Sequence, residues 1–357
     1  MRITKSLGLY LVALAAANTP LSPATACTTV EIPRSKEKIV AKSYDWDQGH
    51  GMAFVNLSGI AKKAVPMKPG DDPAPWVAKY GSVTFNQHGR EFPLGGMNEK
   101  GLVVEIMWLN GSGYPPADKR KSVNELQWIQ YQLDQHASLA EVEKNADAIR
   151  VSNVYAEVHY MVCDASGACG TFEYIGGKLV VHSGASLPYP TLTNNTYSDS
   201  KAYYAGFPGR ATPSGESSLA RFVRATSLAA GFDPAGSVSS VDAAFSILDS
   251  VGGTSYTKFH IVYDPTNKVV RFRTLTHSTI KSVDLAQFDF ACAKDRDKTL
   301  LYDMNQSDKG DVSKSFKPYS VSENRKLIRE GLADVESHLP PGTADKLAAY
   351  PSALPCL

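Results

Sequence analysis

Cys27 is the residue whose surroundings best fit a chemical role. It follows directly after Ala24-Thr25-Ala26, a small-residue pattern typical of the cleavage site of a secretory signal peptide. Cleavage there would make Cys27 the first residue of the mature chain, with a thiol nucleophile beside a free α-amine. Because an α-amine has a pKa of roughly 8, it can accept the thiol proton and later return it to a leaving amine. The sequence therefore predicts nucleophilic catalysis by an N-terminal cysteine.

Residues 1–26 are predicted to be a cleaved signal peptide. Arg2 and Lys5 precede an apolar stretch over residues 7–17, and a polar tail leads to the cleavage site. The apolar stretch is shorter than the roughly 20 residues that cross a bilayer. We therefore expect a periplasmic or secreted protein with no integral membrane segment, in which residues 27–357 form a single domain.

A second interpretation gives Cys27 a different role. A lipid anchor on this cysteine would make the protein an envelope-bound binding or structural module without catalysis. Lipoprotein signals normally place Leu three residues before the cysteine, and Ala24 stands there. The chemical state of the Cys27 amine distinguishes the two, because it is acylated in a mature lipoprotein and free in a hydrolase.

Composition and charge limit the classes of partner. The chain of 357 residues is 43% hydrophobic and 20% charged, which is ordinary for a globular protein. Its 37 basic and 36 acidic side chains leave a net charge of +1, so we expect no nucleic-acid partner. No C-x-x-C, H-E-x-x-H or G-x-S-x-G pattern occurs. We expect neither a metal nor a cofactor, and a small molecule as the partner.

The five cysteines are an odd number, which leaves one unpaired in an oxidising compartment. Cys163 and Cys169 flank a turn-rich segment and could face each other across a hairpin. Cys292 and Cys356 could tie the C-terminal tail to a preceding strand. The pairing does not follow from sequence, but these two bridges would leave Cys27 as the free thiol.

Hydrophobic periodicity predicts groups of strands that alternate with groups of helices. Strands are expected over residues 38–46, 53–57, 82–86, 101–108, 157–162, 170–181, 258–263 and 268–275. Helices are expected over 123–136, 217–230, 241–251 and 322–336, and another should begin at Ser138, with Val142, Ala146 and Ile149 on one side. Short connections between neighbouring strands favour antiparallel sheets. The pattern indicates an α+β fold with two largely antiparallel sheets between two helical layers.

Five short motifs occur in the order found in one known family. They are Cys27-Thr28-Thr29, Lys42-Ser43-Tyr44-Asp45-Trp46, Met97-Asn98-Glu99-Lys100-Gly101-Leu102, Leu192-Thr193-Asn194-Asn195 and the segment from Ser218 to Ala225. In them the chain resembles the choloylglycine hydrolase family, which includes penicillin V acylases and bile salt hydrolases. The resemblance implies a four-layer αββα N-terminal-nucleophile hydrolase sandwich that cuts linear C–N amide bonds. It also implies a homo-oligomer, either a tetramer or a dimer.

The resemblance assigns roles to single residues. Cys27 matches the nucleophile, and Asp45 matches the acid that orients the N-terminal amine and stabilises its protonated form. Asn194 matches the amide that binds the oxyanion, with Asn195 as the rival assignment. An amide N–H aimed at a developing oxyanion is worth roughly 3 kcal/mol.

Two cationic positions complete the expected catalytic set. Arg224 matches the late arginine of the family, and Arg221 is its nearest competitor. Lys42 stands where many members have arginine, so it keeps the positive charge that favours a thiolate but lacks the planar fork of a guanidinium.

Aromatic residues are expected to bind the acyl part of the substrate. Trp108 falls where many members carry a polar residue near the oxyanion hole, so its indole N–H could donate there or its ring could form a wall of the acyl pocket. Tyr44 and Trp46 suit the same pocket. The predicted protein is an exported cysteine amidase, and penicillin V, conjugated bile salts and N-acyl homoserine lactones are all compatible with the resemblance.

Overall fold

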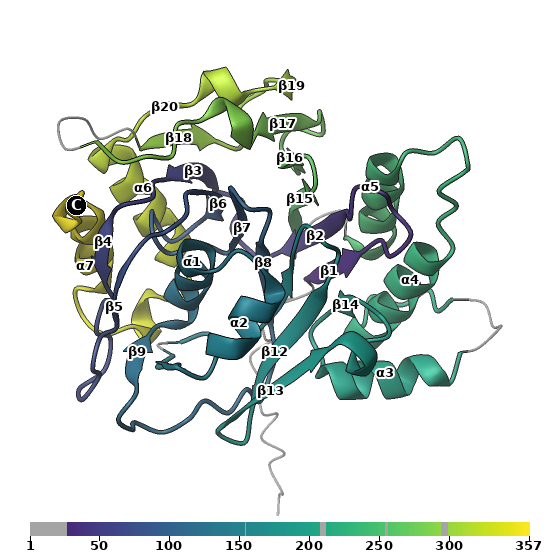
Figure 1. Cartoon of the computed structure of the whole chain (residues 1–357), viewed down its shortest axis with the longest axis horizontal. Coiled ribbons are helices and arrows are strands. Elements are labelled where there is room, and N and C mark those ends of the chain that lie inside the picture. The colour runs from purple at the N-terminus through teal and green to yellow at the C-terminus, as the bar shows by residue number, and fades with distance from the viewer. Residues whose placement is uncertain (1–26, 154, 208–211, 254–255, 294–298) are drawn as a thin grey trace, which may run out of the picture.

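The computed structural model describes residues 27–153, 155–207, 212–253, 256–293 and 299–357. The predicted signal peptide, residues 1–26, lies outside the described residues. Two large sheets dominate the described part of the chain, and Figure 1 shows them side by side with helices on their outer faces.

The first sheet contains the N-terminal strand of the described chain. Its order is β14 (Thr191–Leu192), β1 (Thr28–Glu31), β2 (Val40–Asp45), β15 (Thr257–Asp264), β16 (Val269–Thr274), β17 (Lys281–Asp284) and β19 (Gly310–Asp311). Neighbouring strands are antiparallel except for β17 and β19. Every residue of β1 and β2 is buried, because this sheet is covered on both faces.

The second sheet has more strands and packs against a face of the first. Its order is β13 (Lys178–Ser183), β12 (Cys169–Ile175), β11 (Val158–Cys163), β8 (Val103–Trp108), β7 (Gly95–Asn98), β6 (Ser82–Asn86), β3 (Met52–Asn56), β18 (Leu300–Asp303) and β20 (Lys317–Pro318). Its described pairs are antiparallel. Two small ribbons flank it, β4 (Ala61–Lys63) with β5 (Pro75–Val77) and β9 (Lys121–Val123) with β10 (Ile149–Val151).

Helices cover the outer face of each sheet. On the first sheet lie α4 (Ser218–Ala230) and α5 (Ser240–Val251), with α3 (Tyr197–Ala205) against α4. Against the second sheet packs α1 (Glu125–Gln135), and α2 (Leu139–Asn145), α6 (Val321–Leu332) and α7 (Thr343–Ala349) lie on the same side of the molecule (Figure 1). The order helix, sheet, sheet, helix confirms the predicted αββα sandwich.

Local signals in the sequence account for the starts of three helices. The N-cap side chains of Asn124, Ser138 and Ser217 accept backbone N–H bonds from the first turns of α1, α2 and α4. Two expectations about secondary structure were wrong. The single strand predicted over 170–181 is the hairpin β12–β13, because Gly176 and Gly177 adopt positive φ values of 56° and 79° that permit a turn. Ile149, expected on the second helix, lies in β10.

The cysteine pairing matches the sequence-based suggestion. Cys163 is bonded to Cys169 across β11 and β12, and Cys292 is bonded to Cys356 near the C-terminus. Cys27 is a free thiol. In the part of the chain that the structure describes, no helix has the length and apolarity needed to cross a membrane.

Candidate active site

The pairing of β1 with β2 determines which side chains share a face. Thr29 lies opposite Lys42, and Cys27 precedes Thr29 by two residues. Because side chains alternate along a strand, Cys27 and Lys42 belong to the face toward the second sheet. Asp45 falls on the opposite face, toward α4 and α5. Where β1 begins and β2 ends, the first sheet therefore has a thiol on one face and a carboxylate on the other.

Cys27 is held in a dry environment. It is 5% exposed, and its Sγ lies 3.7 Å from the backbone oxygen of Asp45. Burial raises the pKa of the Cys27 thiol, and the positive charge of Lys42 opposes that rise. A thiolate at this position thus depends on nearby cations.

The Asp45 carboxyl group is anchored through one oxygen. Its Oδ1 accepts hydrogen bonds from Ser43 Oγ at 2.9 Å and from Thr257 Oγ1. Its Oδ2 is buried and has no hydrogen-bond partner among the described residues. Burial raises the pKa of this carboxyl, against the hydrogen bond from Thr257 and the charge of Arg221. A buried carboxylate oxygen beside Cys27 is suited to a cationic partner.

Arg221, and not Arg224, is the arginine that reaches Cys27. Its Nη1 donates to the backbone oxygen of Cys27 at 2.6 Å and to Thr28 Oγ1 at 2.8 Å, and its Nη2 donates to Asn194 Oδ1 at 2.7 Å. Arg221 is 1% exposed, and burial lowers its pKa while the Asp45 charge opposes that shift. The planar guanidinium of Arg221 thus joins the start of β1 to the loop that contains Asn194.

Arg224 holds a different part of the fold, which corrects the assignment made from the motif. Its guanidinium donates to the backbone oxygens of Ser250 at 3.0 Å and of Pro213 at 2.8 Å. These atoms lie at the end of α5 and in the loop before α4. Three residues along a helix advance about 4.5 Å, so Arg221 in the first turn of α4 reaches Cys27 and Arg224 lies past it.

The Asn194 side chain is hydrogen-bonded to α4 and to the second sheet. Its Oδ1 accepts from Arg221, and its Nδ2 donates to the backbone oxygen of Trp108 at 2.8 Å. An amide nitrogen has two hydrogens, so one N–H of Asn194 is left for a further acceptor. Asn195 has no such link to Arg221 or β8 within the described hydrogen bonds, and this favours Asn194 of the two candidates.

His159 and Glu173 support the loop before Asn194, and sequence analysis missed both. His159 Nδ1 lies 2.8 Å from Glu173 Oε1, and its Nε2 lies 2.7 Å from the backbone oxygen of Thr193. All three groups are buried. Each lies on a strand or at a strand end, within an ordinary buried pattern, so no local motif distinguishes them.

Lys42 lies between the two sheets. Its Nζ donates to the backbone oxygen of Ile106 and to Met107 Sδ, the latter at 3.2 Å, and lies 3.8 Å from Glu105 Oε2. Met107 also accepts from Thr29 Oγ1 at 2.9 Å. Lys42 is therefore enclosed between the two sheets, on the same face of the first sheet as Cys27.

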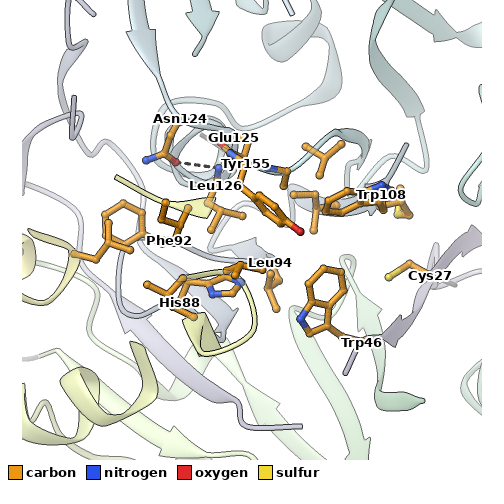
Figure 2. Close-up of a pocket in the computed structure, with 18 of the residues that line it drawn as sticks. Cys27, Trp46, His88, Phe92, Leu94, Trp108, Asn124, Glu125, Leu126 and Tyr155 are labelled. Atoms are coloured by element: carbon orange, nitrogen blue, oxygen red, sulfur yellow. Dashed lines mark hydrogen bonds between the residues drawn. The ribbon is translucent and has the colours of Figure 1, made fainter. Parts of the chain in front are cut away.

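Trp108 lines the pocket, and this favours a role as a pocket wall over one as an oxyanion donor. Its indole N–H donates to Asn110 Oδ1 at 2.6 Å, and its ring packs 5.9 Å from that of Trp46 and 5.8 Å from that of Tyr155. Tyr44 stacks on Phe259 at 5.5 Å and lines the same pocket. Figure 2 shows Cys27 beside the two tryptophans.

The pocket leads away from Cys27 into an apolar interior. It is about 120 Å³ in volume, and its walls come from β8, α1 and the C-terminal helices, including Ile106, Leu126, Leu332, Val335 and Leu347. An apolar cavity of roughly 150 Å³ accepts a benzene ring. The arrangement can therefore receive an apolar group of about that size while the thiol lies at one end.

A histidine lies among the residues that line the pocket away from Cys27. His88 lines the pocket beside Phe92 and Leu94 in Figure 2, and its Nδ1 is buried with no hydrogen-bond partner among the described residues. Burial lowers the pKa of His88 to about 4, so the ring is neutral near pH 7. The pocket thus offers a neutral hydrogen-bonding group in a mainly apolar lining.

The four layers, with a cysteine at the start of the first inner strand, define the N-terminal-nucleophile hydrolase sandwich. Residues 27–197 match the model of the linear amide C–N hydrolases, choloylglycine hydrolase family. The resemblance predicted from the motifs is thereby confirmed.

Known proteins that resemble this chain include two acylases and a hydrolase. A penicillin V acylase of Pectobacterium atrosepticum is 33% identical over 42% of this chain, and the match spans 45% of that acylase. A penicillin V acylase from Agrobacterium tumefaciens superposes with a TM-score of 0.70 at 24% identity, over 82% of this chain and 98% of that one. A mutant of a conjugated bile acid hydrolase from Clostridium perfringens gives 0.64 at 16% identity, over 80% and 98%. The two structures support the fold.

Proposed function

We propose that this protein is an exported cysteine amidase that hydrolyses the linear amide bond of an N-acylated small molecule. The observation that carries the proposal is the cluster around Cys27: a free buried thiol joined through Arg221 to Asn194, at one end of an apolar pocket. The family match begins at Cys27, which supports removal of residues 1–26. A single mature domain over 27–357 remains a prediction. A dimeric or tetrameric assembly remains a prediction.

The reaction we propose has two stages. The α-amine of Cys27 takes the thiol proton, and the thiolate attacks the amide carbonyl to form a C–S bond. The carbonyl oxygen of the substrate becomes an oxyanion, which the remaining N–H of Asn194 and a backbone N–H bind. Collapse breaks the C–N bond, and the ammonium returns its proton to the leaving amine. Water, activated by the amine, then hydrolyses the acyl-thioester and releases the acid.

The pocket supports a substrate with an apolar acyl group. Its walls are mainly aliphatic and aromatic, and the rings of Trp46 and Trp108, which pack against each other, lie next to Cys27. Penicillin V, glycine- or taurine-conjugated bile salts and N-acyl homoserine lactones all carry such an acyl group on a polar amine. The 5% exposure of Cys27 disfavours the lipid-anchor alternative, since a diacylglyceryl group on Sγ would have to extend out of the protein into the membrane.

The decisive experiment combines the chemical state of Cys27 with hydrolysis. Protein recovered from the cell envelope is analysed by intact mass and N-terminal sequencing, and is then given each of the three substrate classes while the released amine is measured. We expect an unmodified chain that starts at Cys27 and releases amine from at least one class. A diacylglyceryl adduct with an acylated amine would remove the base, and the hydrolase proposal would fall.

Asp45 gives a second prediction. Asparagine at this position keeps the hydrogen bonds to Oδ1 but removes the charge that stabilises the protonated amine. Because general acid–base catalysis contributes roughly 10²–10⁴-fold, we expect Asp45→Asn to lower kcat by about 100-fold with little change in KM. Steady-state kinetics on the hydrolysed substrate measures this effect.

Ser43→Ala is the matched control for Asp45→Asn. It removes one 2.9 Å hydrogen bond to the same carboxylate and leaves its charge in place. The control should lose less than about fivefold, the equivalent of one ordinary hydrogen bond. Equal losses in the two variants would mean that the geometry of Asp45 matters and its charge does not.

A further inference from the structure

Glu105 is a buried carboxyl group for which the proposed mechanism has no use. It lies on β8 with 2% exposure, and its Oε2 is 3.8 Å from Lys42 Nζ. Its Oε1 accepts a hydrogen bond from Tyr263 of β15. Glu105 therefore contacts Lys42 from the opposite sheet.

The fold makes room for this carboxyl group. Gly95 lies directly opposite Glu105 on the neighbouring strand β7. A Cβ atom at Gly95 would lie 2.3 Å from Glu105 Oε1, so any other residue there would displace the carboxyl. The adjoining cavity is about 10 Å³, close to the smallest space that holds one water molecule. Glu105 is thus packed against Lys42 and separated from bulk solvent.

Stability does not account for such a pair. Moving two charges out of water costs about as much as their mutual attraction returns, and well-packed apolar residues often replace a buried ion pair without loss. Buried charges whose titration is perturbed occur preferentially at functional sites. The pair of Lys42 and Glu105 adjoins the nucleophile, since the charge of Lys42 acts on the Cys27 thiol.

We propose that Glu105 is a positioning residue for Cys27: its carboxyl group holds the Lys42 ammonium in place and, when ionised, reduces the positive charge that the thiol experiences. The inference rests on the proposed function only in taking Cys27 as the nucleophile. No proton passes from Glu105 to the substrate, and Glu105 acts through Lys42.

The groups that face Glu105 are few. Lys42 and Tyr44 come from β2, Tyr263 comes from β15, Gly95 of β7 presents no side chain, and Met161 of β11 lies opposite without charge. Burial raises the pKa of Glu105 to about 7, and the charge of Lys42 and the Tyr263 hydrogen bond limit the rise. Well below pH 7 the group is therefore mostly neutral, and well above pH 7 it is mostly ionised and opposes Lys42.

Glutamine mimics the neutral form of Glu105. Below pH 7 wild type and Glu105→Gln should therefore behave alike, and above pH 7 the variant should hold more thiolate, because nothing offsets Lys42. A nearby charge commonly moves a pKa by about 1, which corresponds to about tenfold in thiolate at a given pH.

The test is the rate at which iodoacetamide alkylates Cys27, measured by intact mass on the processed protein between pH 5.5 and 9. The other four cysteines are in disulfides, and Cys27→Ala gives the background. We expect rates within twofold at pH 5.5 and about tenfold faster alkylation of Glu105→Gln at pH 8.5. Equal or slower alkylation at pH 8.5 would overturn the proposal. The assay uses no substrate, so its failure would leave the hydrolase proposal standing.

Two further variants complete the test. In a Lys42→Met background, Glu105→Gln should change alkylation by less than twofold, because the group through which Glu105 acts is absent. A tenfold change in that background would show direct action on Cys27 and refute the route through Lys42. If Glu105→Gln does not fold, Tyr263→Phe takes its place. This variant removes a hydrogen bond that stabilises the ionised form of Glu105, so more of Glu105 is neutral above pH 7, and alkylation there should be about threefold faster. No change in Tyr263→Phe would count against the proposal.

Discussion

Replacement of Cys27 by alanine is expected to abolish amide hydrolysis while the fold stays intact. The Cys27 thiol, directly before β1, is free and is the nucleophile that we propose, and a methyl group cannot form the acyl-thioester. Removal of a nucleophile commonly costs about 10⁶-fold in kcat. Cys27→Ser should retain a trace of activity, because a hydroxyl is far less acidic than a thiol. The released amine, followed in a sensitive endpoint assay, gives both rates.

Two controls make the result interpretable. The mass of each variant must show that the chain starts at residue 27, since failed processing would also abolish activity by leaving the amine blocked. The loss of one buried sulfur atom should lower the free energy of unfolding by only about 1 kcal/mol. If correctly processed Cys27→Ala hydrolysed the amide at close to the wild-type rate, the thioester mechanism would be wrong.

Replacement of Arg221 by lysine should have the next largest effect. The guanidinium donates at once to Cys27, Thr28 and Asn194, and an ammonium on a flexible stem cannot reproduce that planar fork. Asn194 would lose the contact that orients its amide, and the loss of one oxyanion donor costs about 10²–10³-fold in kcat. We expect a fall of that size, measured as kcat at saturating substrate.

Arg224→Lys is the matched control, because it makes the same chemical change three residues away on the same helix. Arg224 binds backbone oxygens of Ser250 and Pro213 and makes none of the described contacts with Cys27. Its kcat should stay within about threefold of wild type, although its melting temperature should fall. A larger loss of kcat in Arg224→Lys than in Arg221→Lys would restore the assignment made from the motif.

Patterns within short segments predicted most of the fold. The strand over 82–86 and the helices near 217–230 and 241–251 agree with β6, α4 and α5 within one residue. Their apolar periodicity and capping serines are local properties, readable without tertiary contacts. The helix α3 was missed, because its buried and exposed residues do not form a regular apolar face.

The sequence alone determined that Cys27 follows a cleavage pattern. It also determined which residues the family motifs assign to the same site, and that groups of strands alternate with groups of helices. The choice between Arg221 and Arg224 was not determined in this way, because both lie in one motif and only the packing of α4 on β1 selects the one that meets Cys27. The same holds for Trp108, whose N–H is taken by Asn110, and for Glu105, which meets Lys42 only where two sheets pack face to face. Contacts between distant segments depend on strand register and on how the layers pack, and a local pattern of residues does not predict either.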